Sequence, residues 1–190
     1  WTETLKTRKI GMSYVGLADD CGSRSQFYRV VHDKRVGFKS FSDKKLADFA
    51  YGIQKTLAQY NDAPKVYGEV GRIRFCGELT DWGYLTEIAR PMKQCWDDDC
   101  DGECFRGSCE NSMKIQSVLH YLSRYHGLEY SDAHSANFGY IRRDKTRILV
   151  PIDFGVESFS DMDDMWATET DFWNLRDYCG CTACREECYA

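Results

Sequence analysis

The residues that can do chemistry lie in the second half of the chain, in one loop and the segment after it. Asp132 precedes Asn137 by five residues in Asp-Ala-His-Ser-Ala-Asn, and Asp153 follows sixteen residues later in Asp-Phe-Gly. A carboxylate can orient an attacking hydroxyl, while an amide oxygen and a second carboxylate suit Mg²⁺ on nucleotide phosphates. The pattern favours phosphoryl transfer, with Asp132 as base, Asn137 and Asp153 on the metal, and the early strand residue Lys39 on the phosphates.

In this order the motifs resemble those of the protein-kinase-like superfamily. Asp-x-His-x-x-Asn followed by Ile-Asp-Phe-Gly is similar to its catalytic loop and metal-binding motif. The His two residues after Asp132 is closer to compact phage-type and aminoglycoside-phosphotransferase-like kinases than to eukaryotic protein kinases. Residues 36–39, Val-Gly-Phe-Lys, resemble the strand that carries the phosphate-binding lysine. The resemblance implies ATP and Mg²⁺ as cofactors, and an unidentified protein or small-molecule acceptor as partner.

The resemblance also implies where the nucleotide binds. Gly22 and Ser23 begin a stretch that resembles the phosphate-covering loop, although the full Gly-x-Gly-x-x-Gly is absent. Glu87 and Ile88 lie where the superfamily has its adenine-binding hinge, and we expect Glu87 to offer its backbone rather than its side chain. The helix that normally presents a glutamate to the lysine carries Gln54 instead, which can accept a hydrogen bond but cannot form an ion pair.

The elements that must position these residues follow from periodicity and turn signals. Strand-type runs predict an antiparallel pair over 26–31 and 35–41, and 3/4 spacing predicts a helix from Ser42 or Asp43 to a stop at 61–64. Further strands are expected at 65–70, 72–75, 83–89 and 147–152, a loop at 130–140, and helices at 161–178 and from Asn111 or Ser112 to Gly127.

This order of strands and helices predicts an α+β protein. The resemblance narrows it to a bilobal kinase-like fold: an antiparallel β N-lobe over residues 1–90, an inserted loop over 91–110 and a much shortened helical C-lobe over 111–190. Only 35 residues (190 − 155) follow Gly155, which leaves no room for the usual large peptide-binding lobe. The chain is therefore expected to be a minimal kinase, or a kinase fold that has lost catalysis and serves as a structural or interaction protein such as a phage virion component.

Ten cysteines are the unusual feature of the composition. Eight form two quartets, one in the inserted loop and one near residue 190: Cys95, Cys100, Cys104, Cys109, Cys179, Cys181, Cys184 and Cys188. Their spacing is not the paired C-x2-C of zinc ribbons, so zinc and disulfides stand as alternatives, and either would fasten the short C-terminal part. Asp97, Asp99 and Asp101 match the first half of a calcium loop, but its twelfth position is Ser108 rather than Glu.

Composition limits the classes of protein and of partner. Of the 190 residues, 43% are hydrophobic and 14% aromatic, which is enough for a core and excludes disorder throughout. The net charge of −5 argues against a nucleic-acid surface, and no apolar run approaches the roughly 20 residues that span a bilayer. We therefore expect neither nucleic acid nor a membrane as partner. The expected location is the cytoplasm of an infected or host cell, or a virion, with assembly into a larger particle.

Each chemical assignment has a purely structural alternative. Asp132 and Asn137 can serve simply as turn formers, because both residue types bond to nearby backbone. Lys39 can be a solvated lysine at the edge of a hairpin, where lysine is common. A kinase-like fold would not by itself establish catalysis, because function depends on the geometry of the site.

Overall fold

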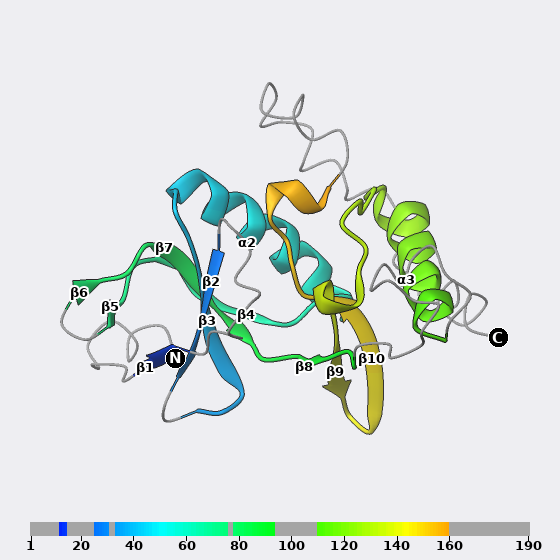
Figure 1. Ribbon diagram of the computed structural model, residues 1–190, viewed down its shortest axis with the longest axis horizontal. Helices are drawn as coiled ribbons and strands as arrows, with labels where there is room; N and C mark the ends of the chain where they lie inside the picture. The colour runs from blue at the N-terminus through cyan, green and yellow to red at the C-terminus, as the bar shows by residue number, and fades with distance from the viewer. Residues whose placement is uncertain (1–11, 15–24, 31–32, 76–77, 94–109, 160–190) are drawn as a thin grey trace. The chain divides into compact units, whose positions relative to one another are not determined.

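The computed structural model describes residues 12–14, 25–30, 33–75, 78–93 and 110–159. Gly22, Ser23, all ten cysteines, the calcium-like stretch and the helix expected at 161–178 lie outside the described residues. In the described part, antiparallel strands combine with two α-helices, which confirms the α+β class (Figure 1). The elements are β1 (Met12–Tyr14), β2 (Ser25–Val30), β3 (Val36–Phe41), α2 (Lys44–Gln59), β4 (Val66–Gly71), β5 (Arg74–Phe75), β6 (Glu78–Leu79), β7 (Trp82–Glu87), β8 (Arg90–Pro91), α3 (Glu110–His126), β9 (Phe138–Arg143) and β10 (Thr146–Pro151), with 3₁₀ turns at Ser135–Asn137 and Val156–Ser158.

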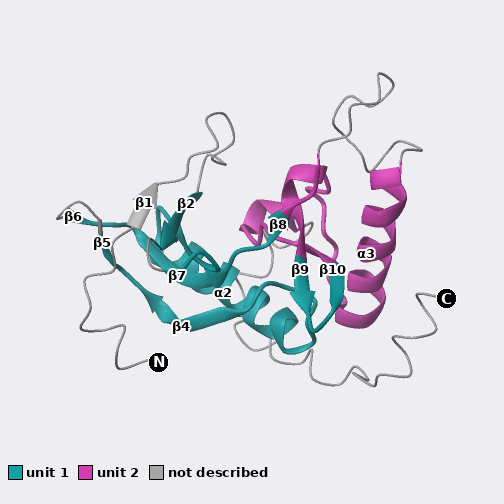
Figure 2. Ribbon diagram, turned by 90° about the horizontal axis from the view of Figure 1, so that it is seen from below, with its two compact units in different colours: residues 1–90, 141–148 teal, residues 91–140, 149–190 magenta. Residues whose placement is uncertain are grey.

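The chain divides into two compact units (Figure 2). Unit 1 contains residues 1–90 and 141–148, and unit 2 contains residues 91–140 and 149–190. The lobe boundaries expected from the sequence place residues 141–148 in the C-terminal lobe. The structure assigns this hairpin to unit 1, where Arg143 hydrogen-bonds to Asn61 and Glu87. None of the described helices is long and apolar enough to cross a membrane.

An antiparallel sheet of five strands, in the order β1-β2-β3-β7-β4, is the centre of unit 1. Lys39 of β3 lies opposite Phe27 of β2 and Tyr84 of β7. Because directly opposed residues share a face of a sheet, these three side chains lie on the same side. The predicted pairing of 26–31 with 35–41 is confirmed by β2 and β3. The other face carries an apolar cluster built on Tyr28, Phe38 and Leu85.

Helix α2 packs on the face of the sheet that carries Tyr84. Its N-cap is Asp43, one of the two predicted candidates, and the Asp43 carboxylate accepts a hydrogen bond from the Lys45 N–H at 2.6 Å. The helix ends before Asn61, whose φ of 63° breaks the helical path. Its buried residues are Ala47, Ala50, Ile53, Gln54 and Leu57. The 3/4 spacing predicts an apolar face of Leu46, Phe49, Ala50, Ile53 and Leu57. The last three are buried as predicted, whereas Leu46 and Phe49 are only half-buried.

Helix α3 is already formed at Glu110, before both of the residues predicted to cap it. The prediction that Asn111 or Ser112 caps this helix is therefore wrong. The Asn111 side chain instead donates to the Lys93 carbonyl at 2.9 Å, and Ser112 is fully buried. The predicted stop at Gly127 is confirmed: its φ is 62°, a backbone conformation that favours glycine.

Strand β9 corrects the prediction of a loop over residues 130–140. The strand begins at Phe138, which is completely buried, and it pairs with β10 and β8 in a sheet of order β10-β9-β8. Polar and glycine residues before and within this segment hid the strand, because pairing and burial rather than local propensity stabilise it. The loop that remains is short and ends in the 3₁₀ turn that contains Asn137.

Two glycines of unit 1 should respond to alanine in opposite directions. A Cβ on Gly83 would overlap the Lys39 carbonyl oxygen across the β3–β7 pair, whereas a Cβ on Gly52, inside α2, would meet nothing within 4 Å. We expect Gly83→Ala to lower the free energy of unfolding by about 1–3 kcal/mol, and Gly52→Ala to raise it by about 0.5–1 kcal/mol. Urea denaturation measures both, and a stable Gly83→Ala protein would contradict the β3–β7 register.

Candidate functional site

The Asp132 to Asn137 loop is closed by its own two end residues. Asn137 Nδ2 donates to Asp132 Oδ2 at 2.8 Å and to the Asp132 carbonyl oxygen at 2.9 Å. His134 supports the same turn, because its N–H donates to the Asp132 carbonyl at 3.1 Å and its own carbonyl accepts from the Asn137 N–H at 2.9 Å. The turn-forming alternative thus describes part of what these residues do. The loop also fixes the carboxylate of Asp132 beside the amide of Asn137.

The segment that carries Asp153 is bonded to the Asp132–Asn137 loop within unit 2. The Ile152 N–H donates to the Asn137 carbonyl at 2.8 Å, which brings Asp153, the next residue, to the end of the Asp132–Asn137 loop. Asp153 Oδ1 accepts from the Gly155 N–H at 3.3 Å, and Phe154 between them is completely buried. A backbone hydrogen bond therefore joins the segment that carries Asp153 to the loop that carries Asp132 and Asn137.

Asp132 and Asp153 are both partly exposed, and 43% of the Asp132 side chain is exposed. His134 Nε2 lies 3.5 Å from the Asp132 Oδ1 atom. Asn137 is buried, with 9% of its surface exposed. A half-exposed carboxylate held by an amide can accept a proton from an incoming hydroxyl, whereas the buried amide is suited to a fixed structural or ligand role.

An amide oxygen and a carboxylate are donor types that Mg²⁺ takes in proteins. Both hydrogen bonds of the Asn137 side chain come from its Nδ2, so Oδ1 is the atom with which this residue would bind a metal ion. Mg²⁺ in nucleotide sites takes one or two carboxylates together with substrate phosphates, and Asp153 supplies such a carboxylate. Across the described ranges, this loop included, no cluster of three or more His, Cys, Asp or Glu side chains is placed to hold a metal.

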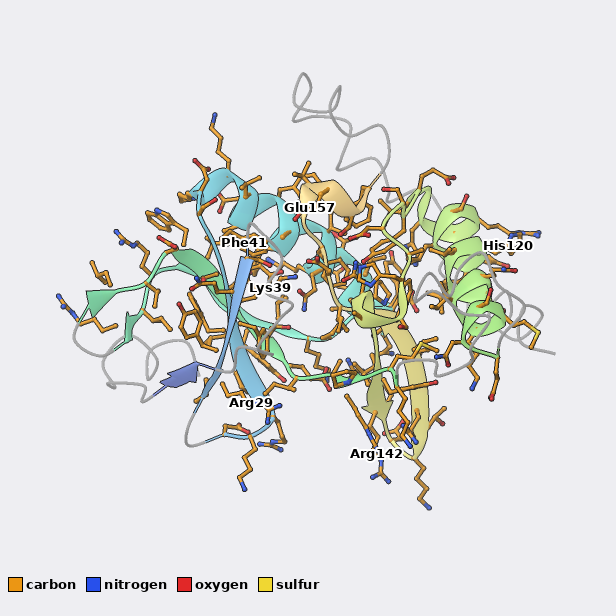
Figure 3. The ribbon with its side chains drawn as sticks, viewed as in Figure 1. Arg29, Lys39, Phe41, His120, Arg142 and Glu157 are labelled. Carbon is orange, nitrogen blue, oxygen red and sulfur yellow. The ribbon has the colours of Figure 1, made fainter. Side chains whose placement is uncertain are left out.

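Lys39 occupies the centre of the unit 1 sheet and is buried. Only 8% of the residue is exposed, so the alternative of a solvated strand lysine is wrong. Its ammonium lies 5.5 Å from the centroid of the Phe41 ring, also on β3 (Figure 3). The Phe41 ring in turn stacks on Tyr84 at 6.0 Å. The aromatic side chains therefore hold the lysine stem in place.

Gln54 of α2 makes its hydrogen bonds to the neighbouring elements of unit 1. Gln54 Oε1 accepts from the Tyr84 hydroxyl at 2.9 Å. Its Nε2 donates to Thr86 Oγ1 at 2.6 Å and to the Pro64 carbonyl at 2.9 Å. This side chain thus satisfies a buried polar position, and it fastens α2 to β7 and to the start of β4.

The backbone donors of the predicted adenine hinge are already used. The Glu87 N–H donates to the Lys65 carbonyl at 2.7 Å and the Ile88 N–H to the Arg35 carbonyl at 2.8 Å. The Glu87 side chain is also engaged, since both of its oxygens accept from Arg143, at 2.9 and 2.8 Å. Adenine recognition in this segment would thus have to use carbonyl groups, or the Ala89 N–H, which has no hydrogen bond among the described residues.

Similarity to known proteins does not identify the chain. No protein-family model matches the sequence, and no curated protein matches it significantly. The functional assignment therefore depends on the residues and their geometry.

Two residues of the site region were missed by sequence reasoning. Tyr130 is buried at the start of the loop, and its hydroxyl donates to the Asp153 carbonyl at 3.0 Å. Glu157 lies over Gly155, because a Cβ on that glycine would be 2.7 Å from the Glu157 carboxylate oxygens; Figure 3 labels Glu157. The only available signal for Tyr130 was a large aromatic residue two positions before Asp132, and nothing in the sequence pattern pointed to Glu157.

Tyr130 should make the protein sensitive to alkaline pH. Burial raises the pKa of Tyr130 well above its ordinary value of 10.0, and the negative charge of Asp153 acts in the same direction. The unfolded chain releases this proton near pH 10 while the folded protein keeps it. The stability due to Tyr130 is therefore complete below that pH and falls as the pH rises further, by at most about 1.4 kcal/mol per pH unit.

Tyr130→Phe removes this ionisable group. From about pH 10 to 11.5, its free energy of unfolding should fall less steeply than that of the wild type. Guanidinium denaturation at each pH measures the two slopes. Parallel slopes would show that Tyr130 does not titrate differently in the folded and unfolded states.

Proposed function

We propose that the chain is a small kinase-like phosphotransferase, similar to compact phage-type and aminoglycoside-phosphotransferase-like kinases, which moves the γ-phosphoryl group of ATP to a hydroxyl acceptor. The observation that carries the proposal is the closed loop in which Asn137 Nδ2 bonds Asp132 Oδ2 at 2.8 Å, with Asp153 joined to the loop through Ile152. Phosphoryl transfer requires positioning and charge stabilisation more than covalent chemistry, and these three polar residues provide the parts it needs.

In this proposal the half-exposed Asp132 is the base for the acceptor hydroxyl. In the step we propose, the hydroxyl oxygen forms a bond to the γ-phosphorus while the bond from that phosphorus to the β–γ bridging oxygen breaks. The hydroxyl proton passes to the Asp132 carboxylate, and ADP leaves with the bridging oxygen. Asn137 keeps the carboxylate oriented through its Nδ2 hydrogen bond.

Asn137 Oδ1 and the Asp153 carboxylate would hold Mg²⁺, which when bound offsets the negative charge of the phosphates. Lys39 would contribute a further positive charge to the nucleotide. Its buried stem and aromatic neighbours restrict the rotamers of this side chain, so little entropy is lost when it binds a phosphate. The acceptor is a small molecule or a protein hydroxyl.

One observation favours a second function, that of a kinase-fold structural or interaction protein, such as a component of a phage particle. Helix α2 presents Gln54 rather than an acid, and the Gln54 oxygen accepts from Tyr84. In protein kinases, an ion pair between the lysine and a helix glutamate must be in place for activity. In this alternative the polar residues of unit 2 act only as loop formers, and the protein does not bind nucleotide.

A thermal-shift experiment with MgATP separates the two functions. Occupancy at about one hundred times Kd adds about 2.7 kcal/mol, which corresponds to an increase of roughly 5–10 °C in Tm for a chain of this size. We expect this increase for the full chain at millimolar MgATP. Lys39→Met should abolish most of it, while Lys44→Met, which removes an exposed lysine near the Trp82 ring, should keep it. No increase with the wild-type protein would favour the structural function.

A further inference from the structure

The tip of the β9–β10 hairpin carries a group of basic side chains. Residues 142–147 read Arg-Arg-Asp-Lys-Thr-Arg, so four of the six are basic and one is acidic. Arg142, Lys145 and Arg147 are exposed, and Figure 3 shows Arg142 beside this tip. The tip is therefore a concentration of positive charge on the surface of unit 1.

The turn of the hairpin sets two of these arginines side by side. Strand β9 ends at Arg143 and β10 begins at Thr146, so the turn between them has two residues. A turn of this length places Arg142 directly opposite Arg147, on one face of the ribbon. Successive side chains of a strand alternate between faces, so Arg143 lies on the other face, where it pairs with Glu87.

The positive charge of Arg142 and Lys145 is not neutralised by an ion pair within the described residues. Arg142 Nε donates to the Asp144 carbonyl at 3.2 Å, and this acceptor is uncharged. Like charges directly opposite each other destabilise a pair of strands, and Arg142 and Arg147 are such a pair. An anion bound to both arginines would offset their repulsion.

The side chains around the tip favour nucleic-acid phosphates over other anionic surfaces. Interfaces with proteins and with lipid surfaces depend on apolar or aromatic anchors as well as on charge. The large hydrophobic side chains exposed in the described part of the chain are Leu79 on β6 and Met113 on α3, so the hairpin offers no such anchor. Phosphates are bound by lysine and arginine alone, and the major groove of B-DNA admits a two-stranded β-ribbon.

We propose that the tip of the β9–β10 hairpin binds the phosphate backbone of double-stranded DNA, without preference for base sequence, through Arg142, Lys145 and Arg147. This binding does not depend on phosphoryl transfer. The net charge of −5, from which no nucleic-acid partner is expected, is an average over the whole chain and does not describe the hairpin. Three phosphate contacts predict that the logarithm of the association constant falls against the logarithm of the salt concentration with a slope of about −2.7.

Fluorescence anisotropy of a labelled DNA duplex, titrated with the full chain at about 50 to 200 mM NaCl, tests the proposal. We expect a Kd of about 1–100 μM near physiological salt. Arg142→Gln combined with Arg147→Gln should raise the Kd at least about tenfold at the lowest salt concentration and make the slope shallower by about 1.8. The Tm of this double variant should not fall, because the substitutions remove a like-charge pair.

Lys44→Gln combined with Lys45→Gln is the matched control. Both lysines are exposed at the start of α2, so the net charge changes equally but away from the hairpin. The Kd for DNA should stay within about threefold of the wild-type value. Equal weakening by the two double variants would overturn the proposal, because overall charge would then account for the binding. Absence of DNA binding by the wild type would also overturn it. So would tighter binding of a labelled oligoglutamate peptide or of anionic lipid vesicles, which would assign the hairpin to an acidic protein or to a membrane.

Discussion

Asp153→Asn should reduce phosphoryl transfer at least a hundredfold while the protein stays folded. The substitution keeps the shape of the side chain and its Oδ1, which accepts from the Gly155 N–H at 3.3 Å. It removes the negative charge that would hold the metal ion on the phosphates, and groups that stabilise transition-state charge typically contribute 10²–10³-fold to turnover. Release of labelled phosphate from γ-labelled ATP, with water as acceptor, measures the loss without knowledge of the natural acceptor.

Asp144→Asn is the control for this experiment. Asp144 lies in the β9–β10 turn of unit 1 with φ of 52°, a conformation that asparagine also tolerates, and its replacement makes the same change of charge outside unit 2. We expect wild-type turnover from this variant and unchanged Tm from both. If Asp153→Asn keeps more than half of the wild-type rate, phosphoryl transfer at this site is refuted.

Arg143→Met should cause a large loss of stability in unit 1. Arg143 and Glu87 form a bidentate ion pair, and their side chains are only 14% and 18% exposed. Arg143 also donates to Asn61 Oδ1 at 2.9 Å and to the Ala63 carbonyl at 3.3 Å. Without the guanidinium, Glu87 keeps only the Lys65 N–H as a donor among the hydrogen bonds in the described part of the chain. A largely buried carboxylate without its partner costs about 3 kcal/mol, which lowers Tm by about 6–12 °C.

A double variant tests whether the ion pair itself is responsible. Because replacing both members by apolar residues removes the unpaired charge, Glu87→Leu combined with Arg143→Met should recover at least half of the lost Tm. Arg35→Ala removes an exposed arginine that pairs with Asp33 in the same unit, and its Tm should not change measurably. Equal effects of Arg143→Met and Arg35→Ala would show that the Glu87–Arg143 pair contributes nothing beyond an exposed one.

The Arg143→Met variant also tests the prediction that the segment around Glu87 binds adenine. The Glu87 side chain accepts from Arg143 within unit 1. If this segment binds adenine, Glu87 can therefore contribute only its backbone. Arg143→Met should consequently lower the Tm of the free protein and preserve the increase in Tm that MgATP produces. The same thermal-shift series reports both quantities.

Local sequence patterns predicted the elements around the site well. The hairpin of β2 and β3, the Asp43 cap of α2 and the Gly127 end of α3 follow from hydrogen bonds and periodicities within a few residues. Two element boundaries that were predicted from local patterns are wrong. Asn111 has the chemistry of a cap but lies inside α3, and the polar loop over 130–140 hid the start of β9 at Phe138. In both places a tertiary contact outweighs the intrinsic preference of the residue.

The sequence by itself determined the order and chemical types of Asp132, Asn137 and Asp153. These three residues lie within one short stretch of the chain, so their spacing can be seen without the fold. Only the tertiary structure decided what joins them: the Ile152–Asn137 hydrogen bond and the reach of Tyr130 across 23 positions. It likewise decided that Glu87 pairs with Arg143, 56 positions away. Such contacts depend on strand register and packing, which no short segment encodes alone.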